Sequence, residues 1–286
     1  MFYRLNDSKF VMTVRVKDIL NSLNTLAPFN LAEPWDNVGL LVGNSDQEVT
    51  AILAGLDPTT SLIDEAIVLG ANTVITHHPV IFKPLQAINT SAPDGRLLEK
   101  ALTNRIAIIG CHTNFDRAHD GVSSILAEQL GLNSHAPLIP TSQENLADSG
   151  LGRIGSYRPP LSAVEFLQRV LDVLGQDSVQ VAGTLPEKIT TVAVCGGSGS
   201  EFAVHARTRG AEVYLSAEIK HNTAIWAIES DFCIIDGTHF STEKPAVAFL
   251  VRMLSQAGRR EKWNIRILET TTERHPFVKL DRNNPQ

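Results

Sequence analysis

Short apolar runs alternate with segments of helical periodicity along the first half of the chain. Runs typical of strands occupy residues 38–42, 50–56, 73–76 and 106–111. Helices are predicted around them, at residues 16–26, 61–69, 96–103 and 120–130. This alternation is typical of a largely parallel sheet covered by helices, in which functional residues lie in the loops beyond the carboxyl ends of the strands.

The second half of the chain repeats this alternation. Its first helix is expected to begin at Ser162, because Ser162 and Glu165 have the spacing of a capping box before an apolar face. Strands are expected at residues 178–183, 190–195, 212–216, 232–236 and 264–269, and helices near 200–209, 221–229 and 243–256. We therefore predict an α/β protein of two interlocked lobes, each a mostly parallel or mixed sheet covered by helices, with a metal site between them.

Residues 134–150 are rich in Pro, Ser and Asn and show no periodicity, so we interpret them as a linker. They would join a first lobe at residues 13–133 to a second lobe at residues 151–286. Residues 1–12 precede the first predicted helix and are expected to be a flexible extension, or to result from an upstream start codon.

Composition and charge exclude several classes of protein. The chain has 25 basic and 31 acidic residues and a net charge of −6, which argues against non-specific binding to nucleic acid or anionic membranes. No apolar run approaches the ~18 residues of a membrane span, and charges stand where a signal peptide needs an apolar stretch. We expect a cytoplasmic protein. Cys111, Cys195 and Cys233 lie in or at the end of apolar runs, so we expect them to be buried small side chains.

The segment VITHHPVIFKP carries the strongest chemical signal, because an apolar strand runs directly into His77 and His78. At a strand end the chain turns, so both imidazoles can point into one pocket, and Pro79 fixes that turn. A histidine at a strand end is more often a hydrogen-bonded structural residue, so this pair alone does not establish a metal site.

Two further apolar runs also end in residues that bind metals. IAIIGCHTNFDRAHDG places His112 and Asp116 four residues apart, and FCIIDGTHFSTEKP does the same for His239 and Glu243. Mixed imidazole and carboxylate ligands suit Zn, Mn, Fe or Ni rather than calcium. A carboxylate such as Glu243 can bridge two ions, and two ions ~4 Å apart can share a water, lower its pKa and make it a nucleophile. The sequence therefore predicts two divalent ions per subunit and hydrolase chemistry.

These three segments, together with AEPWDNVGLLVG and YLSAEIKHN at 214–222, resemble the Nif-three-like (Ngg-interacting-factor-like) family. Its bacterial members are labelled homologues of type-2 GTP cyclohydrolase I. The resemblance runs from about Thr13 to Arg266. It implies a toroidal homohexamer with a dinuclear metal centre in every subunit, facing an internal cavity. It also implies metal ligands at His77, His78, Asp116, His239 and Glu243, with His112 beside them as a further ligand or a residue of the surrounding shell.

One segment departs from the family pattern. Where the family reads roughly TGEIKHH, this chain has Ala217 in place of the glycine and Asn222 in place of the second histidine. Glu218, Lys220 and His221 remain as weak candidates for catalytic residues. Alternatively, Glu218 and Lys220 form a surface ion pair.

Two other motifs leave a functional and a structural interpretation open. CGGSGSEF at 195–202 could bind phosphate, but it lacks the Walker and dinucleotide spacings, so a tight turn between strand and helix is favoured. Trp35, Asp36 and Asn37 could shape a substrate pocket, or Trp35 could lie in the core while its two neighbours form a turn.

The predicted function is metal-dependent hydrolysis of a nucleotide or another small phosphorylated heterocycle, by a cyclohydrolase or phosphoesterase reaction. The alternative is a protein without catalytic activity, either a metal store or a scaffold for regulatory partners. An open coordination position would favour the enzyme, because storage favours saturated sites.

Overall fold

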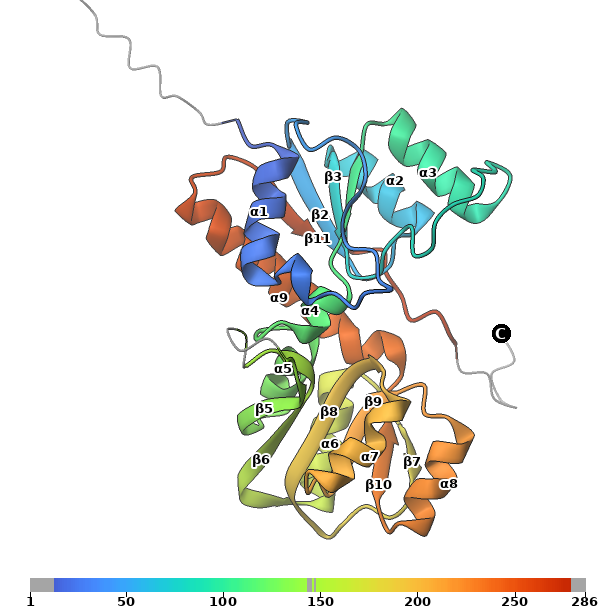
Figure 1. The fold of residues 1–286 in the computed structure, drawn as a ribbon, viewed down its shortest axis with the longest axis vertical. Coiled ribbons are helices and arrows are strands. Elements are labelled where there is room, and N and C mark those ends of the chain that lie inside the picture. Colours follow the sequence, from blue (N-terminus) through green and yellow to red (C-terminus); the bar gives the residue numbers. More distant parts are fainter. Residues whose placement is uncertain (1–12, 143–145, 147, 279–286) are drawn as a thin grey trace, which may run out of the picture.

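The computed structural model describes residues 13–142, 146 and 148–278, and it contains two mixed sheets stacked end to end as two lobes (Figure 1). Helices cover both sheets, so the predicted α/β class is confirmed. The extension predicted at residues 1–12 lies outside the described residues. None of the described helices is long and apolar enough to cross a membrane.

The first sheet has the strand order β1-β4-β3-β2-β11. Its strands are β1 (Gly39–Val42), β2 (Ala51–Gly55), β3 (Thr73–Thr76), β4 (Ala107–Gly110) and β11 (Arg266–Glu269). All pairs are parallel except β1 with β4. Alternate strand residues face opposite sides. One face packs on α1 (Val16–Leu26), and the other packs on α2 (Thr60–Leu69) and α3 (Pro93–Thr103).

The second sheet has the order β5-β6-β8-β9-β10-β7. Its strands are β5 (Asn133–Pro140), β6 (Gly150–Ser162), β7 (Gln180–Ala182), β8 (Lys188–Ser198), β9 (Val213–Ala217) and β10 (Cys233–Asp236). Its helices are α5 (Val122–Gln129), α6 (Ala163–Leu174), α7 (Ala203–Thr208) and α8 (His221–Glu229). β8, β9 and β10 run parallel, which places the loops after them at one edge of the lobe.

The connection between the lobes differs from the sequence prediction. β5 occupies part of the predicted linker, and the long strand β6 was not predicted. Two prolines in β5 and a Pro159–Pro160 pair in β6 hide the strand pattern, because proline is rare inside strands. Helix α5, which was predicted within the first lobe, packs Leu126 and Ala127 into the core of the second sheet.

The end of the chain returns to the first lobe. The long helix α9 (His239–Arg260) begins beside the second sheet and crosses to the first, where β11 pairs in parallel with β2 (Figure 1). The strand predicted at 264–269 thus belongs to the first sheet, although the sequence placed it in the second lobe. Periodicity identifies a strand, but it does not identify the partner of that strand.

Local signals were more reliable. The capping box at Ser162 is present, since Glu165 N donates to Ser162 Oγ at 3.3 Å and Ser162 N donates to Glu165 Oε2 at 2.9 Å. Gly70 ends α2 in the left-handed conformation, with φ of 66°. Cys111, Cys195 and Cys233 are all buried and free, as predicted.

One buried cation, Arg153, joins the second sheet to the segment that follows β4. The Arg153 side chain of β6 is almost fully buried and donates to the carbonyl oxygens of Ala118 and His119 and to Ser124 Oγ. These acceptors satisfy a guanidinium that has no carboxylate partner among the described residues, and burial lowers its pKa to about 10. The contacts tie the second sheet to the segment that carries Asp116.

The segment after β11 fixes the end of β2. The Glu273 carboxylate is buried, accepts from the backbone N–H groups of Leu56 and Asp57, and pairs with Lys244 Nζ of α9 at 2.7 Å. Gly55 allows this approach, because a Cβ there would lie 2.6 Å from Glu273 Oε1. The loop that contains Asp57 is therefore held from the far end of the chain.

We predict that Glu273→Gln lowers the free energy of unfolding by about 1–3 kcal/mol, because the amide loses the charge that pairs with the partly buried Lys244 ammonium and that accepts from two backbone N–H groups. Urea denaturation measures the loss. Glu261→Gln is the matched control, since Glu261 is half exposed and pairs only with its neighbour Arg260 among the described contacts. Equal unfolding energies for the two variants would contradict the role of Glu273.

Candidate metal centre

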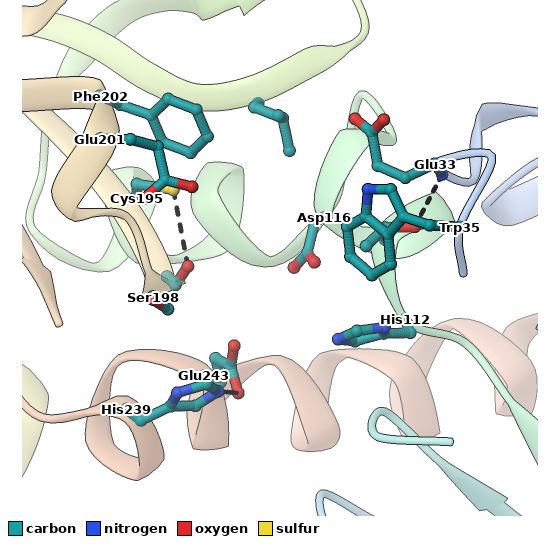
Figure 2. Close-up of a pocket in the computed structure, with 13 residues that line it drawn as sticks. Glu33, Trp35, His112, Asp116, Cys195, Ser198, Glu201, Phe202, His239 and Glu243 are labelled. Carbon is teal, nitrogen blue, oxygen red and sulfur yellow. Dashed lines mark hydrogen bonds and ion pairs between the residues drawn. The ribbon is translucent and has the colours of Figure 1, made fainter. Parts of the chain in front are cut away.

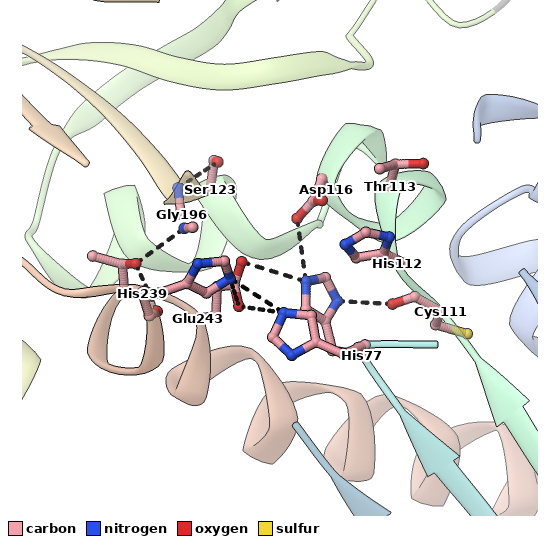
Figure 3. A network of polar contacts seen from close by, with 12 residues as sticks. His77, Cys111, His112, Thr113, Asp116, Ser123, Gly196, His239 and Glu243 are labelled. Atoms are coloured by element: carbon pink, nitrogen blue, oxygen red, sulfur yellow. Dashed lines mark hydrogen bonds and ion pairs between the residues drawn. The ribbon is translucent and has the colours of Figure 1, made fainter. Parts of the chain in front are cut away.

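Three loops bring the predicted ligands together. His77 and His78 follow β3, His112 follows β4, and Asp116 lies on the short helix α4 (Thr113–Arg117). His239 and Glu243 lie on the first turns of α9, after β10 of the other sheet. All of these side chains converge between the lobes, as Figure 3 shows for those it labels. The structure thus places the six predicted residues together, and metal binding by them stays a prediction.

Glu243 lies at the centre of this group and is nearly fully buried. Its Oε2 lies 3.1 Å from His78 Nε2 and 3.1 Å from His239 Nε2. Its Oε1 lies 3.6 Å from His77 Nε2, and that nitrogen is also 3.6 Å from Asp116 Oδ1. Each carboxylate oxygen therefore faces a different set of donors.

The potential ligand atoms form overlapping groups of three, in which all atoms lie within 4.8 Å of one another. Two groups share Glu243, and a third consists of histidines only. The groups are His77 with Asp116 and Glu243, His78 with His239 and Glu243, and His77 with His78 and His112. These clusters are compatible with metal binding.

All four histidines have the same orientation. Each directs Nδ1 to an oxygen: His77 to the Cys111 carbonyl at 2.8 Å, His78 to Asp57 at 2.7 Å, His112 to Asp36 at 2.9 Å and His239 to Glu218 at 2.9 Å. An acceptor at Nδ1 keeps the proton there, which leaves the Nε2 lone pair free to bind a metal. This pairing of imidazoles with oxygen acceptors is the usual second layer of protein metal sites.

Several buried polar atoms at the centre lack a hydrogen bond. Among the described residues, His77 Nε2, Asp116 Oδ1 and Glu243 Oε2 have no hydrogen-bond partner. Buried polar atoms are almost always satisfied, so three unsatisfied atoms within one cluster of side chains need an explanation. A cation bound between them supplies one, and imidazole nitrogen with carboxylate oxygen is a suitable donor set.

The raised pKa values of two histidines also indicate that positive charge is stabilised at this centre. Burial lowers the pKa of His78, but its hydrogen bond to Asp57 and the nearby negative charge of Glu243 outweigh it and raise the pKa to about 10. For His239, burial is likewise outweighed by Glu243 and Glu218, which raise its pKa to about 9. In the absence of metal, protons are therefore the cations that balance these carboxylates.

The CGGSGSEF segment brings backbone close to Glu243. β8 runs through Ser198, and η3 (Ser200–Phe202) and α7 follow, so the segment is a turn between strand and helix, as favoured from the sequence. Gly197 has φ of +68°, and a Cβ there would lie 2.1 Å from Glu243 Oε1. The Gly197 N–H donates to Thr242 Oγ1 at 3.0 Å. The glycine is needed for this close approach.

A cavity of about 510 Å³ opens beside the ligands (Figure 2). Its lining includes Trp35, Phe202, Leu151 and Cys195, the acidic residues Glu33, Asp116, Glu201 and Glu243, and the polar residues His112, Thr113, Ser198 and His239. Trp35 is 60% exposed, so it borders the pocket and does not lie in the core. Asp36 holds His112 and Thr113, and Asn37 Nδ2 donates to the Ile81 carbonyl at 2.6 Å.

The segment after β9 contributes one residue to the centre. Glu218 pairs with His239 at 2.9 Å and makes no ion pair with Lys220 among the described residues, so the alternative of a surface pair is wrong. Lys220 and His221 are exposed at the start of α8 and do not line the cavity. Asn222, which departs from the family pattern, is also exposed on α8. A catalytic role for Lys220 or His221 stays a prediction.

Sequence reasoning missed Asp57, the acceptor of His78. It directly follows the strand predicted at 50–56, in the same kind of position as the histidines. A carboxylate after an apolar strand was therefore the available signal. The sequence indicates Asp36 and Glu218 as candidate pocket residues, but it does not predict their hydrogen bonds to His112 and His239.

Comparisons with known proteins show which family this chain resembles. Residues 14–276 match the family Duf34/NIF3 (NGG1p interacting factor 3). A Streptomyces coelicolor relative named GTP cyclohydrolase 1 type 2 homolog is 34% identical over 267 residues, which cover 92% of this chain and 94% of the relative. A Clostridium acetobutylicum relative of the same name is 31% identical over 266 residues, which cover 93% and 99%. The crystal structure of a Staphylococcus aureus hypothetical protein matches with a TM-score of 0.88 at 29% identity, covering 94% of this chain and 100% of that one.

We predict that Gly197→Ala disturbs Glu243 and therefore lowers both unfolding free energy and bound metal. Gly210→Ala is the matched control, because Gly210 has φ of +84° with nothing within 4 Å of an added Cβ. Both variants carry the backbone cost of about 1 kcal/mol, and only Gly197→Ala adds the clash. Urea denaturation and metal analysis after dialysis measure the difference. Indistinguishable variants would contradict it.

Proposed function

The chain belongs to the Duf34/NIF3 family, and we propose that it is a hydrolase that depends on two divalent metal ions. One ion would be held by His77, Asp116 and Glu243, and the other by His78, His239 and Glu243. His112 would remain beside the first ion as a further ligand.

The shared position of Glu243 carries the proposal. Its two oxygens face two different donor groups, and a bridging carboxylate is what a pair of adjacent ions requires. When bound, such ions supply Lewis acidity, which lowers the pKa of water and polarises a substrate oxygen. The chain holds the ligands for this chemistry, since Asp57 and Glu218 fix the ring orientation of His78 and His239.

A metal store or a regulatory scaffold is the alternative function. Each donor group offers three protein atoms, fewer than the four of a closed structural zinc site. The groups also border a cavity of about 510 Å³, which leaves room for water and substrate. Open positions next to a cavity favour an enzyme over a store.

The reaction could be a cyclohydrolase or a phosphoesterase reaction. The relatives named GTP cyclohydrolase 1 type 2 homolog favour the first, which opens a purine imidazole ring. Phosphoester hydrolysis would use the same centre. Assays of the metal-loaded protein on nucleotides and phosphoesters separate the two reactions. If the protein turns over none of these compounds, the metal store is favoured.

We predict close to two divalent ions per subunit in the purified protein and almost none in Glu243→Ala, because one carboxylate serves both ions. Elemental analysis after dialysis measures this. Glu229→Ala, an exposed change on α8, should keep the wild-type content. Full metal content in Glu243→Ala would refute the bridging role.

The family resemblance also supports a proposal about assembly, namely a homohexamer with the centres facing an internal cavity. Light scattering should give a mass near six times that of one chain. A monomer at micromolar concentration would contradict the proposed assembly.

A further inference from the structure

We propose that the cavity beside the metal ligands binds an uncharged planar heterocycle that carries N–H donors, such as a purine base, and that it disfavours the triphosphate form of the same compound. This inference rests on the proposed function, because it names the substrate class of that site. It differs from what the relatives' names suggest, since GTP itself would be a poor ligand.

The cavity lacks the cations that recognise phosphate. No lysine or arginine lines it among the described residues. The nearby Arg117 guanidinium is already paired with the Glu33 carboxylate. Arginine forks and lysine ammonium groups are the usual protein partners of phosphate oxygens. A polyphosphate would therefore have to be balanced by the metal ions alone.

The charges around the metal ligands leave little attraction for an anion. Glu243 and Asp116 lie among the histidines, and Asp36, Asp57 and Glu218 contact them from outside. These carboxylates together outnumber the charges of two divalent ions. Solvent screens the partly exposed Asp57 and Glu218, but the Asp36 side chain is fully buried and keeps its effect. Glu201 adds a further negative charge at the cavity wall.

The same lining suits a flat ring with donor groups. Trp35 and Phe202 lie on opposite sides of the cavity in Figure 2. Glu33 lies near Trp35, and Glu201 precedes Phe202 in the sequence. Aromatic side chains bind planar rings by stacking. The Glu201 carboxylate, and the Glu33 oxygen that does not pair with Arg117, would accept hydrogen bonds from ring N–H and amino groups. Glu243 and His239 also line the cavity, so a bound ring would lie next to the metal ligands.

Calorimetric titration of the metal-loaded protein with guanosine, GMP and GTP tests the proposal, because the three compounds share one base and differ in charge. We expect affinity to fall from guanosine to GTP by about tenfold at low ionic strength, and by less at high salt. Metal content is measured after each titration, so that removal of metal by GTP is recognised.

Variants identify the parts of the cavity that set this preference. Glu201→Gln should reduce the difference between guanosine and GTP, whereas Glu229→Gln, the same change on exposed α8, should leave it unaltered. Trp35→Ala should weaken all three compounds alike, and Phe277→Ala, at an exposed aromatic outside the cavity, should weaken none. Inosine, which lacks the amino group of guanosine, should bind more weakly than guanosine.

Binding and turnover separate the two proposals. Binding of guanosine without turnover of any compound would refute the hydrolase and leave the ligand class in place. Tighter binding of GTP than of guanosine, or no binding of any of these compounds, would overturn the inference about the ligand. Turnover of a phosphoester by a protein that binds none of the purine compounds would also overturn the inference about the ligand, but it would support the hydrolase.

Discussion

The buried carboxylate of Glu243 is the interaction on which the rest of the site depends. A carboxylate removed from water is stable only when cations or hydrogen-bond donors surround it. Here the surrounding atoms are imidazole nitrogens from His77, His78 and His239. Because their Nδ1 atoms are bound to oxygen acceptors, these rings in their neutral form would turn lone pairs towards that carboxylate. The lone pairs of the imidazole nitrogens and of the carboxylate oxygens repel each other, so the arrangement requires positive charge between them.

This requirement explains why the chain crosses between the lobes at its end. The histidine pair follows a strand of the first sheet, whereas Glu243 is on a helix that begins beside the second. Helix α9 continues into the first lobe, and Glu273 then fixes the loop of Asp57, which in turn orients His78. Hence the position of His78 depends on contacts made by the last described segment. The lobes cannot separate without disturbing the centre.

The sequence singled out the six residues that the structure brings together, because each follows an apolar strand and parallel strands bring their carboxyl ends to one edge of a sheet. Helix α8 was predicted with its observed bounds, and the capping box at Ser162 placed α6. The sheet to which β11 belongs could not be predicted from local patterns. Arg266 of β11 pairs with Ala51 of β2, which lies 215 positions earlier in the sequence. The hydrogen bond of Asp36 to His112 spans 76 positions and escapes local patterns for the same reason.

Two of the non-glycine residues with positive φ lie where the second sheet meets the centre. Glu218 and Thr238 have φ of 52° and 64°, a region that costs about 1–3 kcal/mol for residues other than glycine. Both turns are held by Asp236, whose two oxygens accept from Ile219 N and Thr238 N at 2.9 Å. One turn presents His239 and the other presents its acceptor Glu218, so Asp236 fixes the ligand and its partner together. Strain that is maintained by a dedicated carboxylate serves the site, because a relaxed turn would point Glu218 away from the imidazole it orients.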